Sequence, residues 1–116
     1  MADQDQLDPE DAKIVTLART ARARVGAAEG AAVRDTDGRT YAACTVALPA
    51  LRLSALQAAV ATAVASGAEG LEAAAVVTDA AEVAEDSAAA VRVLGAQAPI
   101  LRADARGEVA EVLRPA

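Results

Sequence analysis

The chain has 116 residues, which is enough for one small domain but too few for two. Its net charge of −6 disfavours binding to the phosphates of nucleic acids and to an anionic membrane surface. With no histidine and a single cysteine, the chain lacks the ligands of a zinc or iron site and the base of a Ser-His-Asp or Cys-His enzyme. We therefore expect no metal and no cofactor.

Alanine accounts for 35 of the 116 residues, and Tyr41 is the only aromatic residue. Because alanine side chains bury little apolar area, a small domain of this composition gains limited stability from its own core. Association of several chains adds buried area, so the composition favours an oligomer. The single cysteine forms no internal disulfide, and neither a signal peptide nor a membrane-spanning stretch is visible, so we expect a cytoplasmic protein.

The first predicted element is a helix that follows an acidic terminus. We expect residues 1–7 to be flexible and residues 8–116 to form one domain. Asp8 is a typical capping residue before Pro9, and apolar residues then recur at helical spacing up to Gly26, which ends the helix.

A hairpin is predicted next. Residues 30–34 and 39–46 read as two short strands, and Asp37 and Gly38 between them supply the positive φ that a tight turn needs. Pro49 breaks the second strand pattern and predicts a loop.

Helices and strands alternate over the rest of the chain. The pattern predicts helices over 54–66 and 80–94 and strands over 71–78 and 100–103, with a final strand or helical turn over 108–113. Strand–helix–strand crossovers imply parallel strands, whereas the hairpin adds an antiparallel pair. The predicted fold is therefore α/β, with a mixed sheet covered by helices.

Two motifs of the predicted hairpin are the run Gly30-Ala-Ala-Val33 and the turn Asp37-Gly-Arg-Thr-Tyr41. The run is similar to the V-G-A-A segment that opens the first strand in the small nucleoside cytidine deaminases, and the turn is similar to the D-G-x-x-Y turn of that family. The similarity continues in order over residues 12–114, with a short deletion around Pro49. It implies a three-layer cytidine deaminase-like fold, whose mixed five-stranded sheet is opened by a β-hairpin, and assembly into a homotetramer or a dimer.

The resemblance also carries an expectation about chemistry. In that family a zinc ion held by three cysteines, or by a histidine and two cysteines, activates water for attack on cytosine, and a glutamate moves the protons. Ser54 stands at the first ligand position, Leu56 at the glutamate, and Ser87 and Ala90 at the Cys-x-x-Cys pair. Neutral hydroxyls do not replace thiolates, and leucine carries no proton. The resemblance therefore implies a degenerate member without catalytic residues or zinc.

The nucleoside pocket implied by the resemblance is altered as well. The asparagine and glutamate that bind ribose in the family are replaced by Thr45 and Ala47, and the phenylalanine that stacks on the base falls at Ala27 or Ala28. The residues expected around any remaining ligand are Thr45, Ala47, Ser54 and Ser87.

Helix capping explains several polar residues without any chemistry. Ser54 is a typical N-cap residue at the predicted start of the helix over 54–66. Asp79 and Glu82 have the spacing of a capping box for the helix that follows them. The arginines in the last turns of the first helix suit its negative end and are expected in solvent.

Three hypotheses about function follow. The leading one is a catalytically inactive cytidine deaminase-like protein that serves as an oligomeric scaffold or binds a protein partner of unknown identity. The alternative is a small-molecule binder that uses the former nucleoside pocket. The third is residual deamination of cytidine or deoxycytidine.

Overall fold

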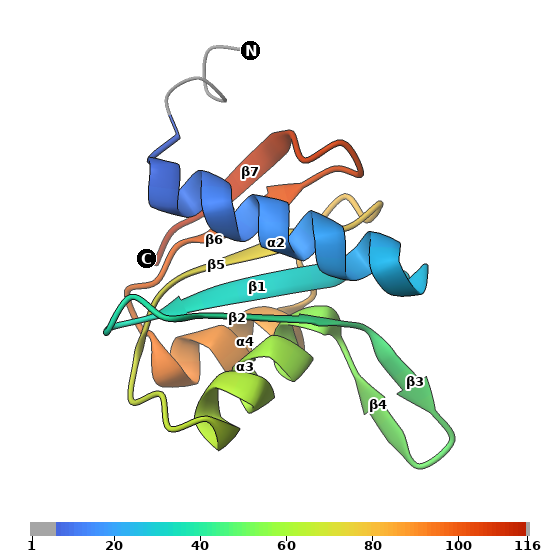
Figure 1. Ribbon diagram of the computed structural model, residues 1–116, viewed down its shortest axis with the longest axis horizontal. Coiled ribbons are helices and arrows are strands. Elements are labelled where there is room, and N and C mark those ends of the chain that lie inside the picture. The colour runs from blue at the N-terminus through green and yellow to red at the C-terminus, as the bar shows by residue number, and fades with distance from the viewer. Residues whose placement is uncertain (1–6, 116) are drawn as a thin grey trace.

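Residues 7–115 are described in the computed structural model of the chain (Figure 1). Their helices and strands are, in chain order, α2 (Pro9–Val25), β1 (Gly30–Asp35), β2 (Thr40–Cys44), β3 (Val46–Leu48), β4 (Leu51–Leu53), α3 (Ala55–Ala65), β5 (Leu71–Val77), α4 (Glu85–Leu94), β6 (Ile100–Ala103) and β7 (Val109–Leu113). Every predicted element has a counterpart in this order, and β3 and β4 lie where the sequence predicts a loop.

The strands of the main sheet are ordered β2-β1-β5-β6-β7. β5 and β6 run parallel, whereas β1 is antiparallel to both β2 and β5, and β7 is antiparallel to β6. Helix α2 covers one face of the sheet, and α3 and α4 cover the other, so the domain has three layers (Figure 1). The predicted α/β fold, with a mixed five-stranded sheet opened by a hairpin and flanked by helices, is confirmed.

Local signals fix both ends of α2 and its position on the sheet. The Asp8 carboxylate accepts a hydrogen bond from the N–H of Glu10 at 2.7 Å, and Gly26 ends the helix with a φ of 68°. Gly30 opens β1 directly beneath the helix, where a Cβ atom would collide with the backbone oxygen of Ala18. Any larger residue at this position would push α2 away from the sheet.

Two apolar clusters lie on the opposite faces of the sheet. The cluster under α2 contains the fully buried Ile14, and the cluster under α3 and α4 contains Leu56 and Ile100. Between them, the centre of β5 consists of three buried alanines, residues 73–75. Small side chains let the helices approach the sheet closely, so few large side chains are enough to fill the core.

The start of α4 differs from the prediction. The helix begins later than the sequence suggests, at Glu85, and its N-cap residue, Ala84, makes no side-chain cap hydrogen bond. The predicted capping box of Asp79 and Glu82 is therefore wrong. Asp79 instead forms an ion pair with Arg22 of α2 at 2.9 Å, so its carboxylate serves a contact between distant segments rather than the adjacent helix.

The predicted loop around Pro49 is the turn of a second hairpin. β3 and β4 pair antiparallel, with Leu48 opposite Leu51. The predicted strand over 39–46 is therefore split at Thr45. The N–H of Thr45 donates a hydrogen bond to the backbone oxygen of Glu29, in the loop before β1. Proline suits the turn because its fixed φ is favourable there. The hairpin extends away from the body of the domain (Figure 1).

The N-terminal segment expected to be flexible comprises residues 1–7. Residues 1–6 lie outside the described residues, and Leu7 packs against the cluster under α2. At the other end, the segment predicted as a strand or a helical turn is a strand, β7. Within residues 7–115, none of the helices combines the length and the apolar character that crossing a membrane requires.

A buried carboxylate organises the turn between β1 and β2. Asp35 is 2% exposed and accepts hydrogen bonds from the Tyr41 hydroxyl at 2.8 Å and from the N–H groups of Asp37 and Arg39, each at 2.9 Å. Burial raises the pKa of the Asp35 carboxyl, but these hydrogen bonds and the charge of Arg39 outweigh it and hold the pKa below its ordinary value. The turn therefore favours the ionised form of Asp35.

Acid is expected to destabilise the protein through this turn. Because the pKa of Asp35 is lower in the folded chain, its contribution to stability is fully present above the unfolded pKa of about 3.9 and is lost as the pH falls through the folded pKa. We expect thermal unfolding to show a smaller acid-induced loss of stability for Asp35→Asn than for the parent. Asp37→Asn, in the same turn but exposed, is the control. Equal acid sensitivity of the parent and Asp35→Asn would contradict this account.

Candidate functional site

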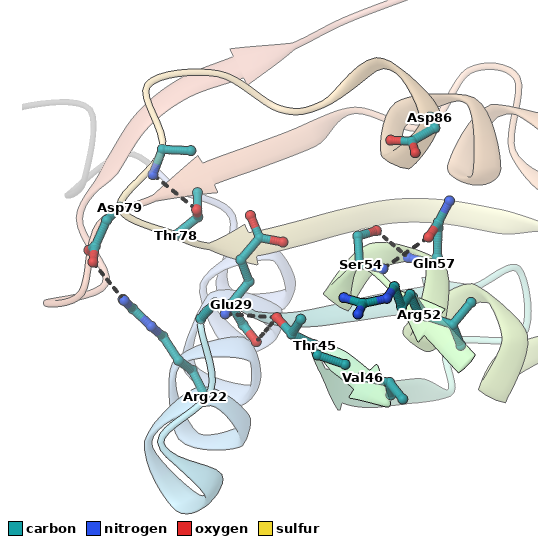
Figure 2. A pocket seen from close by; sticks show the side chains of 14 residues that line it. Arg22, Glu29, Thr45, Val46, Arg52, Ser54, Gln57, Thr78, Asp79 and Asp86 are labelled. Carbon is teal, nitrogen blue, oxygen red and sulfur yellow. Dashed lines mark hydrogen bonds and ion pairs between the residues drawn. The ribbon is translucent and has the colours of Figure 1, made fainter. Parts of the chain in front are cut away.

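A pocket of about 640 Å³ opens at the carboxyl end of β5, beside the first turns of α3 and α4. Its walls also include the end of α2, the loop before β1 and the base of the β3–β4 hairpin (Figure 2). Ligands of open α/β sheets commonly bind at the carboxyl ends of the strands. We therefore take this pocket as the candidate functional site.

Two serines meet beside the pocket, at the starts of α3 and α4. Ser54 is the N-cap of α3: its Oγ accepts a hydrogen bond from the N–H of Gln57 at 3.2 Å, and its own N–H donates to the Gln57 side chain at 2.9 Å. This confirms the predicted capping role. Ser87 lies in the first turn of α4, is 4% exposed, and donates its hydroxyl to Ser54 Oγ at 2.7 Å. The hydrogen bond joins two segments that are far apart in the sequence.

The other two positions aligned with catalytic residues lie outside the pocket lining. Leu56 is 1% exposed and belongs to the apolar cluster under α3 and α4. Ala90 is half-buried on α4, one turn after Ser87. Neither side chain offers a proton donor, a proton acceptor or a metal ligand.

The predicted groove residues are distributed around the same pocket. Thr45, Ala47 and Ser54 line it, as does Ala28, whereas the buried Ser87 does not line it and is hydrogen-bonded to Ser54. The Thr45 hydroxyl accepts from the N–H of Glu29 at 2.9 Å and donates to the backbone oxygen of the same residue at 3.3 Å. Thr45 therefore fixes the loop before β1 rather than offering a free hydroxyl to a ligand.

The residues at the aligned metal positions do not fit a zinc ion. Ser54 and Ser87 are neutral hydroxyls already hydrogen-bonded to each other, and Ala90 has no ligand atom. Zinc sites in proteins use thiolates, imidazole nitrogens and carboxylates. Between Leu7 and Pro115, no group of three or more such side chains is placed to hold a metal ion.

Charged residues in the pocket wall were not identified from the sequence. Arg22 donates to the Asp79 carboxylate at 2.9 Å and to the backbone oxygen of Ala27 at 3.3 Å, so it is not the purely solvated residue that was expected. Further charged residues around the pocket are Glu29, Arg52 and Asp86 (Figure 2). They come from separate segments and share no local motif, so only the folded chain brings them together.

Comparisons with known proteins support the fold described above. A model of the cytidine deaminase-like family matches residues 7–107. The cytidine deaminase from Burkholderia pseudomallei superposes with a TM-score of 0.76 at 22% identity, covering 88% of this chain and 90% of that one. A variant of the Mycobacterium tuberculosis cytidine deaminase gives 0.68 at 24% identity, covering 80% and 85%. The Mycobacterium leprae cytidine deaminase gives 0.64 at 21% identity, covering 82% and 89%.

The fold therefore places the chain among three-layer α/β domains that resemble cytidine deaminases. Since the family model covers most of the sequence, the chain belongs to the cytidine deaminase-like family, as the motifs of the hairpin suggest. A search of the curated proteins found no match. At these identities the solved structures establish the shared fold, and any activity of this chain has to be argued from its own residues.

A mutant cycle on the two serines tests whether they act as a unit. Ser54→Ala removes the N-cap, which costs about 0.5–2 kcal/mol, and leaves the buried Ser87 hydroxyl without its acceptor, which adds about 1–3 kcal/mol. Ser87→Ala leaves the cap in place and should cost less. We expect the double variant to lose less stability in chemical denaturation than the sum of the single variants. Additive losses would show that the hydroxyls do not interact.

Proposed function

We propose that this chain is a non-catalytic member of its family that binds a molecule without deaminating it. The observation that carries the proposal is the 2.7 Å hydrogen bond between Ser87 and Ser54. These two side chains align with metal-ligand positions of the family, but they are neutral hydroxyls that form a hydrogen bond with each other. Leu56, aligned with the glutamate that moves protons, is buried in the core, so the site has no group for acid–base catalysis at that position.

Loss of deamination is tested directly with the purified protein. We expect no change in the ultraviolet absorbance of cytidine or deoxycytidine above the buffer control, with or without added zinc, because no metal ligand set and no proton carrier occupies the aligned positions. Turnover that scales with protein concentration and survives repurification would overturn the proposal.

A variant with three cysteines tests whether the three positions aligned with the metal ligands lie close enough together to bind zinc. Ser54→Cys, Ser87→Cys and Ala90→Cys together restore a thiolate set of the kind that binds zinc. We expect this variant to retain zinc through gel filtration, measured by atomic emission, and the parent to retain none. If the folded variant also fails to retain zinc, the three positions do not converge as the alignment requires.

The size and position of the pocket favour a small molecule as the ligand. Its volume of about 640 Å³ is in the range of ligand sites in proteins. It lies at the sheet edge where ligands of α/β domains are commonly found, and polar and charged side chains from several elements surround it. These features support the binding hypothesis that uses the former nucleoside pocket.

The β3–β4 hairpin favours a second role, that of an oligomeric scaffold. Leu48 and Leu51 are paired across the hairpin. They are 54% and 49% exposed, because the hairpin extends from the domain (Figure 1). Exposed leucines on a projecting element are typical of a contact surface. We infer that a second copy of the chain covers them, because the alanine-rich core leaves the isolated domain with little buried apolar area.

Charge at the tip of the hairpin is expected to disrupt this assembly. Because a carboxylate loses its hydration when it is buried, Leu48→Asp with Leu51→Asp should shift the mass measured by light scattering from that of an oligomer toward that of a monomer. Val25→Asp, at an exposed apolar position at the end of α2, is the control and should leave the mass unchanged. An unchanged oligomer in the double variant would exclude the hairpin as the interface.

A further inference from the structure

Two of the charged side chains around the pocket form an ion pair with each other, and the others form none with residues 7–115. Arg22 and Asp79 neutralise each other through their 2.9 Å ion pair. Arg52, Glu29 and Asp86 also line the pocket, but none of these three takes part in an ion pair with any of residues 7–115. As far as residues 7–115 are concerned, the wall therefore presents one unpaired cation and two unpaired carboxylates to a ligand (Figure 2).

The polar groups beside Arg52 suit an anion. Ser54 Oγ already accepts two hydrogen bonds, from Gln57 and Ser87, so its own proton remains available to donate. Arg52 and Ser54 both line the pocket, and they lie two residues apart in the chain. A carboxylate next to Arg52 would therefore meet a guanidinium and a neutral hydroxyl donor.

The opposite part of the wall suits cations. Glu29 precedes β1, and Asp86 belongs to the first turn of α4, so the two carboxylates come from different layers of the domain. Figure 2 shows the Glu29 side chain directed toward the space between Thr78 and Ser54, with Asp86 across the pocket. Carboxylates accept strong hydrogen bonds from ammonium and guanidinium groups.

We propose that this pocket binds a dibasic amino acid, a ligand with one carboxylate and two cationic groups. The inference rests on the binding role proposed above and adds the class of ligand. The carboxylate lies against Arg52 and Ser54, and the two cationic groups lie against Glu29 and Asp86. Such a ligand neutralises each wall charge that has no ion-pair partner among residues 7–115, whereas a neutral nucleoside neutralises none of them. The pocket volume of about 640 Å³ accommodates a molecule of this size.

Calorimetric titration with three probes tests the ligand class. L-Arginine carries all three groups, agmatine is the same molecule without the carboxylate, and cytidine is neutral. We expect L-arginine to bind with one site per chain, agmatine to bind about tenfold more weakly because the contact with Arg52 is lost, and cytidine not to bind. Cytidine binding without L-arginine binding would overturn the ligand class while leaving the binding role intact. No binding of any probe would also overturn this inference.

Conservative variants locate the site. Glu29→Gln and Asp86→Asn should each weaken L-arginine binding about tenfold, because each removes one charge without changing the shape of the side chain. Arg52→Gln should weaken L-arginine binding but not agmatine binding, because agmatine has no carboxylate and is repelled by the guanidinium; a general loss of folding cannot produce this difference. Arg24→Gln, which removes an exposed charge elsewhere, is the control. L-Arginine binding that is unaffected in the three pocket variants would show that the ligand binds at another place.

Discussion

The candidate site depends on a contact between the starts of two helices. The hydroxyl of Ser87 reaches Ser54 at 2.7 Å and thereby joins α4 to α3 beside the carboxyl end of β5. Ser54 also caps α3, so a single oxygen atom accepts hydrogen bonds from both helices. The resemblance aligns both serines with metal-ligand positions of the family, and here their hydroxyls are hydrogen-bonded to each other.

The alanine content explains both the compactness of the domain and its dependence on other contacts. Alanines at the centre of the sheet let helices pack closely on both faces, and Gly30 permits a close approach between α2 and β1. The same small side chains bury little area per residue, so the core provides limited stabilisation. Polar interactions add order where apolar burial is limited: the Arg22–Asp79 ion pair joins distant segments, and the hydrogen bonds of Asp35 hold the turn between β1 and β2.

Most of the fold was predictable because strong local signals mark the elements. Asp8 and Gly26 delimit α2, Ser54 caps α3, and the short apolar strands alternate with helices. One error arose where a local signal had a distant partner, because Asp79 has the spacing of a cap but pairs with Arg22. The other is local: Pro49 lies in the turn of a short hairpin, which a proline alone does not distinguish from an irregular loop.

The candidate site was predictable only in part, for the same reason. Family motifs identified Thr45, Ala47 and Ser54, which line the pocket. The charged residues that give the pocket its character come from unconnected segments, and in the sequence each resembles an ordinary solvated charge. Their grouping depends on the arrangement of the sheet and the helices, which no local pattern contains.

We propose that the fold of this family persists here without its metal chemistry. Native mass spectrometry of the protein, purified without chelator, measures bound metal and assembly in one spectrum. The account predicts an oligomer whose mass is a multiple of the 116-residue chain with no zinc added. One zinc ion per chain would contradict it, because residues other than those at the aligned positions would then have to form the metal site.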